Sequence, residues 1–151
     1  MSQVIFVNSP GETEAIGEAL CRALLSQNAR RAFVALYGDM GVGKTAWCRG
    51  FGRGLQIDRV KSPTYTIVNE HRGTPFSLYH FDMYRIQDSD DLYTIGYDDY
   101  LAREGYILCE WSERIPYDIP ADAITVLIEK TDDAQGRKIT IGGIKIEYSG
   151  T

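Results

Sequence analysis

Residues 38–45 read GDMGVGKT, and they constrain this chain more than any other stretch. They match G-x-x-x-x-G-K-[ST], a loop whose glycines let the backbone turn its N–H groups toward phosphate oxygens. The apolar run AFVALY, residues 32–37, precedes the loop, and a helix-compatible segment from residue 44 to about 54 follows it. A strand, a glycine loop and a helix in this order predict a nucleotide-phosphate site, since the positive end of the helix also faces the anion.

Two residues of the loop have distinct expected tasks. Lys44 is placed to reach the β- and γ-phosphates, and the Thr45 hydroxyl to ligate Mg²⁺. The alternative is a chance match in a glycine-rich turn, which the flanking strand and helix disfavour. We therefore expect ATP and Mg²⁺ as cofactors, held by the loop and the residue after it: Gly38, Asp39, Met40, Gly41, Val42, Gly43, Lys44, Thr45 and Ala46.

The rest of the chain alternates strand-like and helix-like segments. Ser9-Pro10-Gly11-Glu12 is typical of a helix start, and that helix is expected to run to about residue 28. Further strands are predicted at 3–7, 76–84 and 106–111, with one or two short helices within 87–104. The segment at 60–71 is expected to start as a loop and to continue as a β-prone stretch. Residues 123–129 and 138–148 alternate in period two, which favours antiparallel strands. Residues 1–151 thus predict one P-loop NTPase-like α/β domain: a mostly parallel central sheet, flanking helices and antiparallel C-terminal strands.

Composition and charge exclude some functions. The chain has 151 residues and a formal net charge of −5, which disfavours non-specific nucleic-acid binding. The sequence has neither a membrane-spanning apolar run nor a recognisable leader, so we expect a cytoplasmic protein. The spacing of Cys21, Cys48 and Cys109 suggests neither a zinc site nor a disulfide framework. We expect three small buried hydrophobes, with a reactive thiol as the alternative.

A phosphate loop needs additional oxygen ligands for magnesium, usually from a carboxylate at the end of a neighbouring strand. Glu110 follows the apolar run at 106–109, and Asp82 lies near the end of the strand predicted at 76–84. Both are expected at the carboxyl edge of the sheet, where open α/β folds bind ligands. Glu110 could reach the metal directly or through water. Asp82 could hold a metal-bound water or orient the attacking water. The alternative for each is a solvated turn residue.

Residues 62–66, SPTYT, lie between the phosphate-loop helix and the strand that carries Asp82. P-loop proteins often place a switch segment there, which senses the γ-phosphate. The alternative is an ordinary turn in which the hydroxyls make local hydrogen bonds.

Five motifs in order carry a resemblance to a known family: GDMGVGKT, VKSPTYTIVNEH, YHFDMYR, IGYDDY and ILCEW. Their order and spacing resemble the TsaE (YjeE) family over nearly the whole chain, more weakly after about residue 115. The resemblance implies a small ATPase needed for threonylcarbamoyladenosine at position 37 of tRNA. It implies TsaB and TsaD as partners, contact with tRNA only through that complex, and no membrane. ATP hydrolysis would drive or reset the complex.

The resemblance also implies roles for single residues. Lys44 and Thr45 take the phosphate and magnesium roles, while Glu110 and Asp82 are similar to the family's metal-linked and catalytic carboxylates. Trp111 matches the tryptophan beside that glutamate. Thr13 belongs to the segment at 9–13, which resembles the part that flanks the adenine.

Several residues leave their interpretation open. Ala46 stands where the family often has a second hydroxyl, so any phosphate contact from that hydroxyl is missing. Trp47 is expected to pack in the core rather than sense nucleotide. His71 and His80 are expected to be structural. The acidic, tyrosine-rich stretch at 88–100 predicts a solvated face, with a docking surface for TsaB or TsaD as the alternative.

Two other functions compete with the ATPase. A small-molecule kinase on this scaffold needs an arginine-rich lid, but the segment at 85–104 is acidic and holds only Arg85 and Arg103. A nucleotide-dependent binding module with negligible chemistry is the other alternative.

Overall fold

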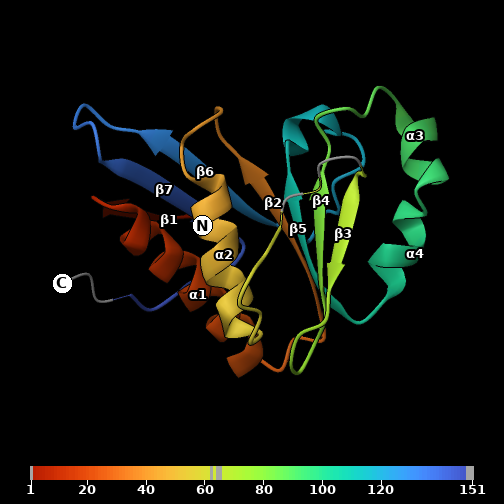
Figure 1. Cartoon of the computed structure of the whole chain (residues 1–151), viewed down its shortest axis with the longest axis horizontal. Coiled ribbons are helices and arrows are strands. Elements are labelled where there is room, and N and C mark those ends of the chain that lie inside the picture. Colours follow the sequence, from red (N-terminus) through yellow and green to blue (C-terminus); the bar gives the residue numbers. More distant parts are fainter. Residues whose placement is uncertain (1, 62, 64–65, 149–151) are drawn as a thin grey trace.

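The computed structural model describes residues 2–61, 63 and 66–148 (Figure 1). Seven strands form one mixed sheet in the order β1-β7-β6-β2-β5-β4-β3. In chain order the strands are β1 (Ser2–Val7), β2 (Arg31–Tyr37), β3 (Val68–His71), β4 (Leu78–Asp82), β5 (Gly105–Glu110), β6 (Ile124–Lys130) and β7 (Arg137–Gly142). The helices are α1 (Pro10–Ser26), α2 (Lys44–Gly54), α3 (Ser89–Thr94), α4 (Tyr97–Ala102) and the 3₁₀ turn η1 (Ser112–Arg114).

The centre of the sheet is parallel, as predicted. Strand β2 pairs in parallel with both β5 and β6, and β5 pairs in parallel with β4. Antiparallel pairs extend the sheet on both sides, with β3 on β4 at one edge and β7 between β6 and β1 at the other. This arrangement confirms a single α/β domain with a parallel core.

Strand β2 supplies side chains to two separate cores because successive residues of a strand face opposite sides. Val34 and Leu36 join the core beneath α1 and α2, whereas Phe33 and Ala35 join the core beneath α3 and α4. Figure 1 shows the two helix pairs at the two sides of the parallel strands. A strand covered on both faces is apolar throughout, which explains the run at 32–37.

Helix α1 begins as its sequence predicts. The Ser9 hydroxyl accepts a hydrogen bond from the N–H of Glu12 at 3.1 Å, and the Glu12 carboxylate accepts one from the N–H of Asn8 at 2.8 Å. Pro10 occupies the first turn, where its missing N–H costs nothing. The helix ends at Ser26, and Asn28 then adopts a left-handed φ of 57°.

One sequence prediction needs correction at the C-terminal end. The antiparallel strand expected over 138–148 ends at Gly142, and Gly143 turns the chain with a φ of 91°. Residues 144–148 form no strand. The Gln3 side chain instead makes two hydrogen bonds of 2.9 Å to the main chain of Ile146. These side-chain bonds take the place of the strand-to-strand hydrogen bonds that were expected here.

Glycines let α1 and α2 approach each other closely. A Cβ on Gly17 would overlap the main-chain oxygen of Trp47, and a Cβ on Gly50 would overlap the main chain of Glu14. The Glu14 carboxylate also pairs with Arg49 and Arg53 across the same contact. No described helix is long and apolar enough to cross a membrane.

We predict that Gly50→Ala destabilises the fold, because its methyl group would push the α2 backbone away from α1. Overpacking of this kind costs about 2 kcal/mol, more than the roughly 1 kcal/mol that alanine gains over glycine in a helix. Urea unfolding followed by circular dichroism measures the difference. Gly11→Ala is the matched control, because the nearest atom to its Cβ, the Ser9 Oγ, lies 3.9 Å away. A Gly50→Ala variant as stable as the parent would contradict the close contact.

Candidate active site

The glycine-rich loop connects the end of β2 to the start of α2, as its motif predicts. Gly38, Gly41 and Gly43 all adopt positive φ, at 144°, 79° and 116°. Gly43 is the N-cap of α2, and having no side chain it leaves the first-turn N–H groups of the helix uncapped. This is the geometry of an anion site, because those N–H groups and the helix dipole point to the same place.

Lys44 lies folded over the loop. Its side chain donates a 2.6 Å hydrogen bond from Nζ to the Gly38 carbonyl, and Nζ lies 4.3 Å from the centre of the Trp111 ring. Only 6% of Lys44 is exposed, so the ammonium group is largely withdrawn from bulk water. A cavity of about 300 Å³ adjoins it, lined by Met40, Gly41, Gly43, Lys44, Thr45, Glu110 and Trp111.

Two smaller hollows flank this cavity. One, of about 180 Å³, is lined by Ser9, Pro10, Thr13, Gly41, Val42, Gly43, Ala46, Gln135 and Arg137. Thr13 and Ala46 therefore lie together beside the loop, although the Thr13 hydroxyl donates to the carbonyl of Ser9, the N-cap of α1, at 3.4 Å. Arg137 donates a 2.7 Å hydrogen bond to the Val42 carbonyl, which ties β7 to the loop. Sequence reasoning missed Arg137, since nothing in its local sequence indicates that contact.

The second hollow, of about 190 Å³, lies on the carboxylate side. Met40, Pro63, Thr66, Ile67, Asp82, Tyr84, Arg85 and Trp111 line it. The predicted switch segment contributes Pro63 and Thr66 here, and the Thr66 hydroxyl donates to the Val68 carbonyl at 3.1 Å. Ser62, Thr64 and Tyr65 lie outside the described residues.

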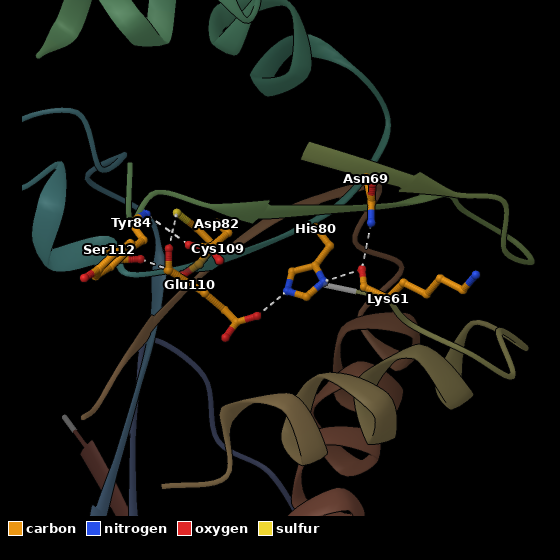
Figure 2. A network of polar contacts seen from close by, with 8 residues as sticks. All are labelled: Lys61, Asn69, His80, Asp82, Tyr84, Cys109, Glu110 and Ser112. Carbon is orange, nitrogen blue, oxygen red and sulfur yellow. Dashed lines mark hydrogen bonds and ion pairs between the residues drawn. The ribbon is translucent and has the colours of Figure 1, made fainter. Parts of the chain in front are cut away.

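Asp82 and Glu110 are direct neighbours at the ends of β4 and β5. Asp82 accepts a 3.0 Å hydrogen bond from the N–H of Tyr84. Burial raises the pKa of Asp82, the nearby Glu110 raises it further, and the Tyr84 N–H acts in the opposite direction. The sequence therefore placed both carboxylates correctly at one edge of the sheet (Figure 2).

Glu110 makes a short contact with His80, a histidine of β4. Its Oε2 lies 2.6 Å from Nε2 of His80, and both side chains are buried (Figure 2). The other ring nitrogen of His80 faces the Lys61 carbonyl at 3.3 Å. His80 was expected to be only structural, but it precedes Asp82 by two residues and so shares its face of β4. That spacing was the available signal.

Other interpretations are settled by burial. Trp47 is fully buried and stacks on Phe51 at 5.6 Å, so it packs in the core as expected. The three cysteines are free and buried, as expected. Burial raises the pKa of Cys48 well above its usual range, and Glu110 adds to the effect.

Some aspartates of the acidic stretch at 88–100 accept hydrogen bonds from the main chain at the start of α3. Asp88 caps α3 by accepting from the N–H of Asp91, and Asp91 accepts from the N–H of Gln87. Tyr97 is buried and its hydroxyl donates to the Asp118 carbonyl at 2.8 Å, whereas Tyr93 is 84% exposed.

Comparison with known proteins places the chain in a family. The model of the family described as "Threonylcarbamoyl adenosine biosynthesis protein TsaE" matches residues 7–139. The "tRNA threonylcarbamoyladenosine biosynthesis protein TsaE" of Bacillus subtilis (strain 168) is 37% identical over 143 residues, covering 93% of this chain and 85% of that protein. The protein of the same name from Haemophilus influenzae is 39% identical over 121 residues, 79% of this chain and 77% of that one.

The solved structures agree with the sequences. The chain superposes on the crystal structure of Bacillus subtilis YdiB with a TM-score of 0.77 and 31% identity, covering 93% of this chain and 84% of the other. Sequence and fold thus point to one assignment over almost the whole length. The chain belongs to the TsaE family, whose named role is in tRNA threonylcarbamoyladenosine biosynthesis.

Proposed function

We propose that this chain is a small magnesium-dependent ATPase that works with TsaB and TsaD in forming threonylcarbamoyladenosine at position 37 of tRNA. Hydrolysis of ATP drives or resets that complex, and the chain reaches tRNA through its partners. The observation that carries the ATPase is that the uncapped start of α2, the buried Lys44 and the Glu110 carboxylate meet at one cavity, with Asp82 paired to Glu110 on the neighbouring strand.

The residues present suit a nucleotide triphosphate. The first-turn N–H groups of α2 and the loop glycines supply donors for phosphate oxygens, with Lys44 as the adjacent cation. Ala46 offers no hydroxyl at the next position, so the backbone and Thr45 carry that part of the contact. The hollow that contains Thr13 and Ala46 continues from the loop and suits the base.

The donor set also suits magnesium, which prefers oxygen ligands. Thr45, Glu110 and Asp82 would hold the ion, directly or through water. When bound, magnesium neutralises negative charge on the phosphate oxygens. Asp82 then has either of two tasks, holding a metal-bound water or orienting the water that attacks.

The kinase alternative loses support from the packing of α3 and α4. Leu92 and Tyr97 insert into the core beneath these helices, and the Tyr97 hydroxyl is tied to Asp118. A segment anchored in this way is poorly suited to close over a nucleotide as a lid.

The proposal predicts that TsaB and TsaD together, with tRNA, stimulate phosphate release from ATP by this chain. Phosphate release is measured with the chain alone, with each partner and with both. A kinase would instead form ADP without free phosphate, and a binding module would give no turnover under any of these conditions. Either outcome would overturn the proposal.

We expect Lys44→Ala to lower ATP turnover by about 100-fold or more, because it removes the cation that faces the phosphates. Steady-state hydrolysis at saturating Mg²⁺ measures the loss. Lys145→Ala is the control, since that lysine is exposed on the C-terminal segment. Near-parental hydrolysis by a folded Lys44→Ala variant would remove Lys44 from the site.

We expect Asp82→Asn to keep ATP binding while single-turnover hydrolysis falls by about 100-fold, since the amide retains the shape but not the charge. Titration calorimetry gives the dissociation constant and rapid quench gives the rate. Asp122→Asn, an exposed aspartate, serves as the control. Binding that weakens in step with turnover would argue against a catalytic role for Asp82.

A further inference from the structure

Three potential metal ligands converge beside the phosphate loop. Cys48 comes from α2, His80 from β4 and Glu110 from β5. One ligand atom of each lies within 4.8 Å of the other two, and the three residues are 1%, 1% and 7% exposed. They lie 30 or more positions apart in sequence, so no motif reveals the cluster.

The hydrogen bonds of His80 orient its ring toward this cluster. Nδ1 faces the carbonyl oxygen of Lys61, which can only accept, so Nδ1 carries the proton in that contact. A carbonyl partner on one ring nitrogen is the arrangement that prepares the other for a metal. Nε2 lies 2.6 Å from a carboxylate oxygen of Glu110, so the second ring nitrogen faces the cluster (Figure 2).

Without metal, a proton lies between Nε2 of His80 and the Glu110 carboxylate in this short contact, and a divalent cation can replace it. A thiolate and a carboxylate together carry two negative charges, which balance a divalent cation, while the imidazole binds as a neutral ligand. Sulfur, nitrogen and oxygen as a set favour zinc over magnesium, because magnesium takes oxygen ligands almost alone.

The geometry requires only small movements. Zinc holds sulfur at about 2.3 Å and nitrogen or oxygen at about 2.0–2.2 Å, so tetrahedral ligand atoms lie about 3.3–3.6 Å apart. The separation between His80 Nε2 and Glu110 Oε2, 2.6 Å, is shorter than that range, and the ligand atoms of all three residues lie within 4.8 Å of one another. Glu110 also lines the 300 Å³ cavity, which offers an entry path and room for a water as fourth ligand.

We propose that Cys48, His80 and Glu110 form a binding site for Zn²⁺ or a similar thiophilic divalent cation, which adjoins the proposed magnesium site and shares Glu110 with it. Its consequence rests on the proposed function: a cation held here engages Glu110 and removes it from the magnesium site. Zinc therefore inhibits hydrolysis of ATP through Cys48, and a residue change at Cys48 relieves that inhibition.

Cobalt tests the site directly, because Co²⁺ replaces zinc and a thiolate ligand gives a charge-transfer band in the near ultraviolet. The full, reduced, metal-free chain is titrated with Co²⁺, and Zn²⁺ is then added to displace it. We expect one equivalent of Co²⁺ to produce the band and Zn²⁺ to abolish it. A parent chain that shows no thiolate band would overturn the proposal.

Variants assign the ligands. Cys48→Ser should lose the band, whereas Cys21→Ser, an equally buried cysteine in α1, should keep it. Glu110→Gln retains the thiol and should weaken Co²⁺ binding by about 100-fold or more. A band that persists in Cys48→Ser, or an unchanged affinity in Glu110→Gln, would contradict the cluster. Circular dichroism without metal checks that each variant is folded.

The two proposals fail separately. The cobalt spectrum needs no nucleotide, so a chain that binds Co²⁺ but hydrolyses no ATP keeps the cation site and loses the ATPase. A chain that hydrolyses ATP but gives no thiolate band keeps the ATPase and loses the cation site. If both hold, Zn²⁺ should inhibit the parent and Cys21→Ser but leave the hydrolysis by Cys48→Ser unaffected.

Discussion

The close contact between α1 and α2 determines where the candidate site lies. Gly17 and Gly50 bring the two helix backbones together, and the Glu14 carboxylate pairs with two arginines of α2 across the contact. Because α2 packs against α1 and the sheet, its first turn lies beside the ends of β2 and β5. The loop glycines can then aim the uncapped N–H groups at one point, and the proposed phosphate site depends on that alignment.

Glu110 links the two proposals. It is the last residue of β5, which is buried along its whole length. Its carboxylate therefore meets little water, and neighbouring protein groups must supply its hydrogen bonds and counter-charges. Toward the cavity it neighbours Lys44 and Thr45, which suits magnesium and nucleotide. Toward the core it contacts His80, with Cys48 close by. One carboxylate at the boundary between a polar cavity and a buried cluster is therefore open to competition between two kinds of cation.

Local patterns predicted much of this molecule. Some features depend on only a few neighbouring positions and could be predicted without tertiary information. These are the glycine spacing of 38–45, the apolar run before it and the capping residues of α1. Asp82 and Glu110 were placed together because parallel strands end at a common edge. The C-terminal strand was predicted too long, since period-two alternation continues past Gly143 while the backbone turns there.

By itself, the sequence determined the loop, the order of strands and helices, and the two carboxylates at the edge of the sheet, because short-range spacing encodes them. Only the tertiary structure decided the partners of those groups. Arg137 reaches the loop from β7, 95 positions along the chain, and His80 meets Glu110 across 30. Contacts of that kind depend on sheet register and helix packing, which bring distant residues together without leaving a pattern in the local sequence.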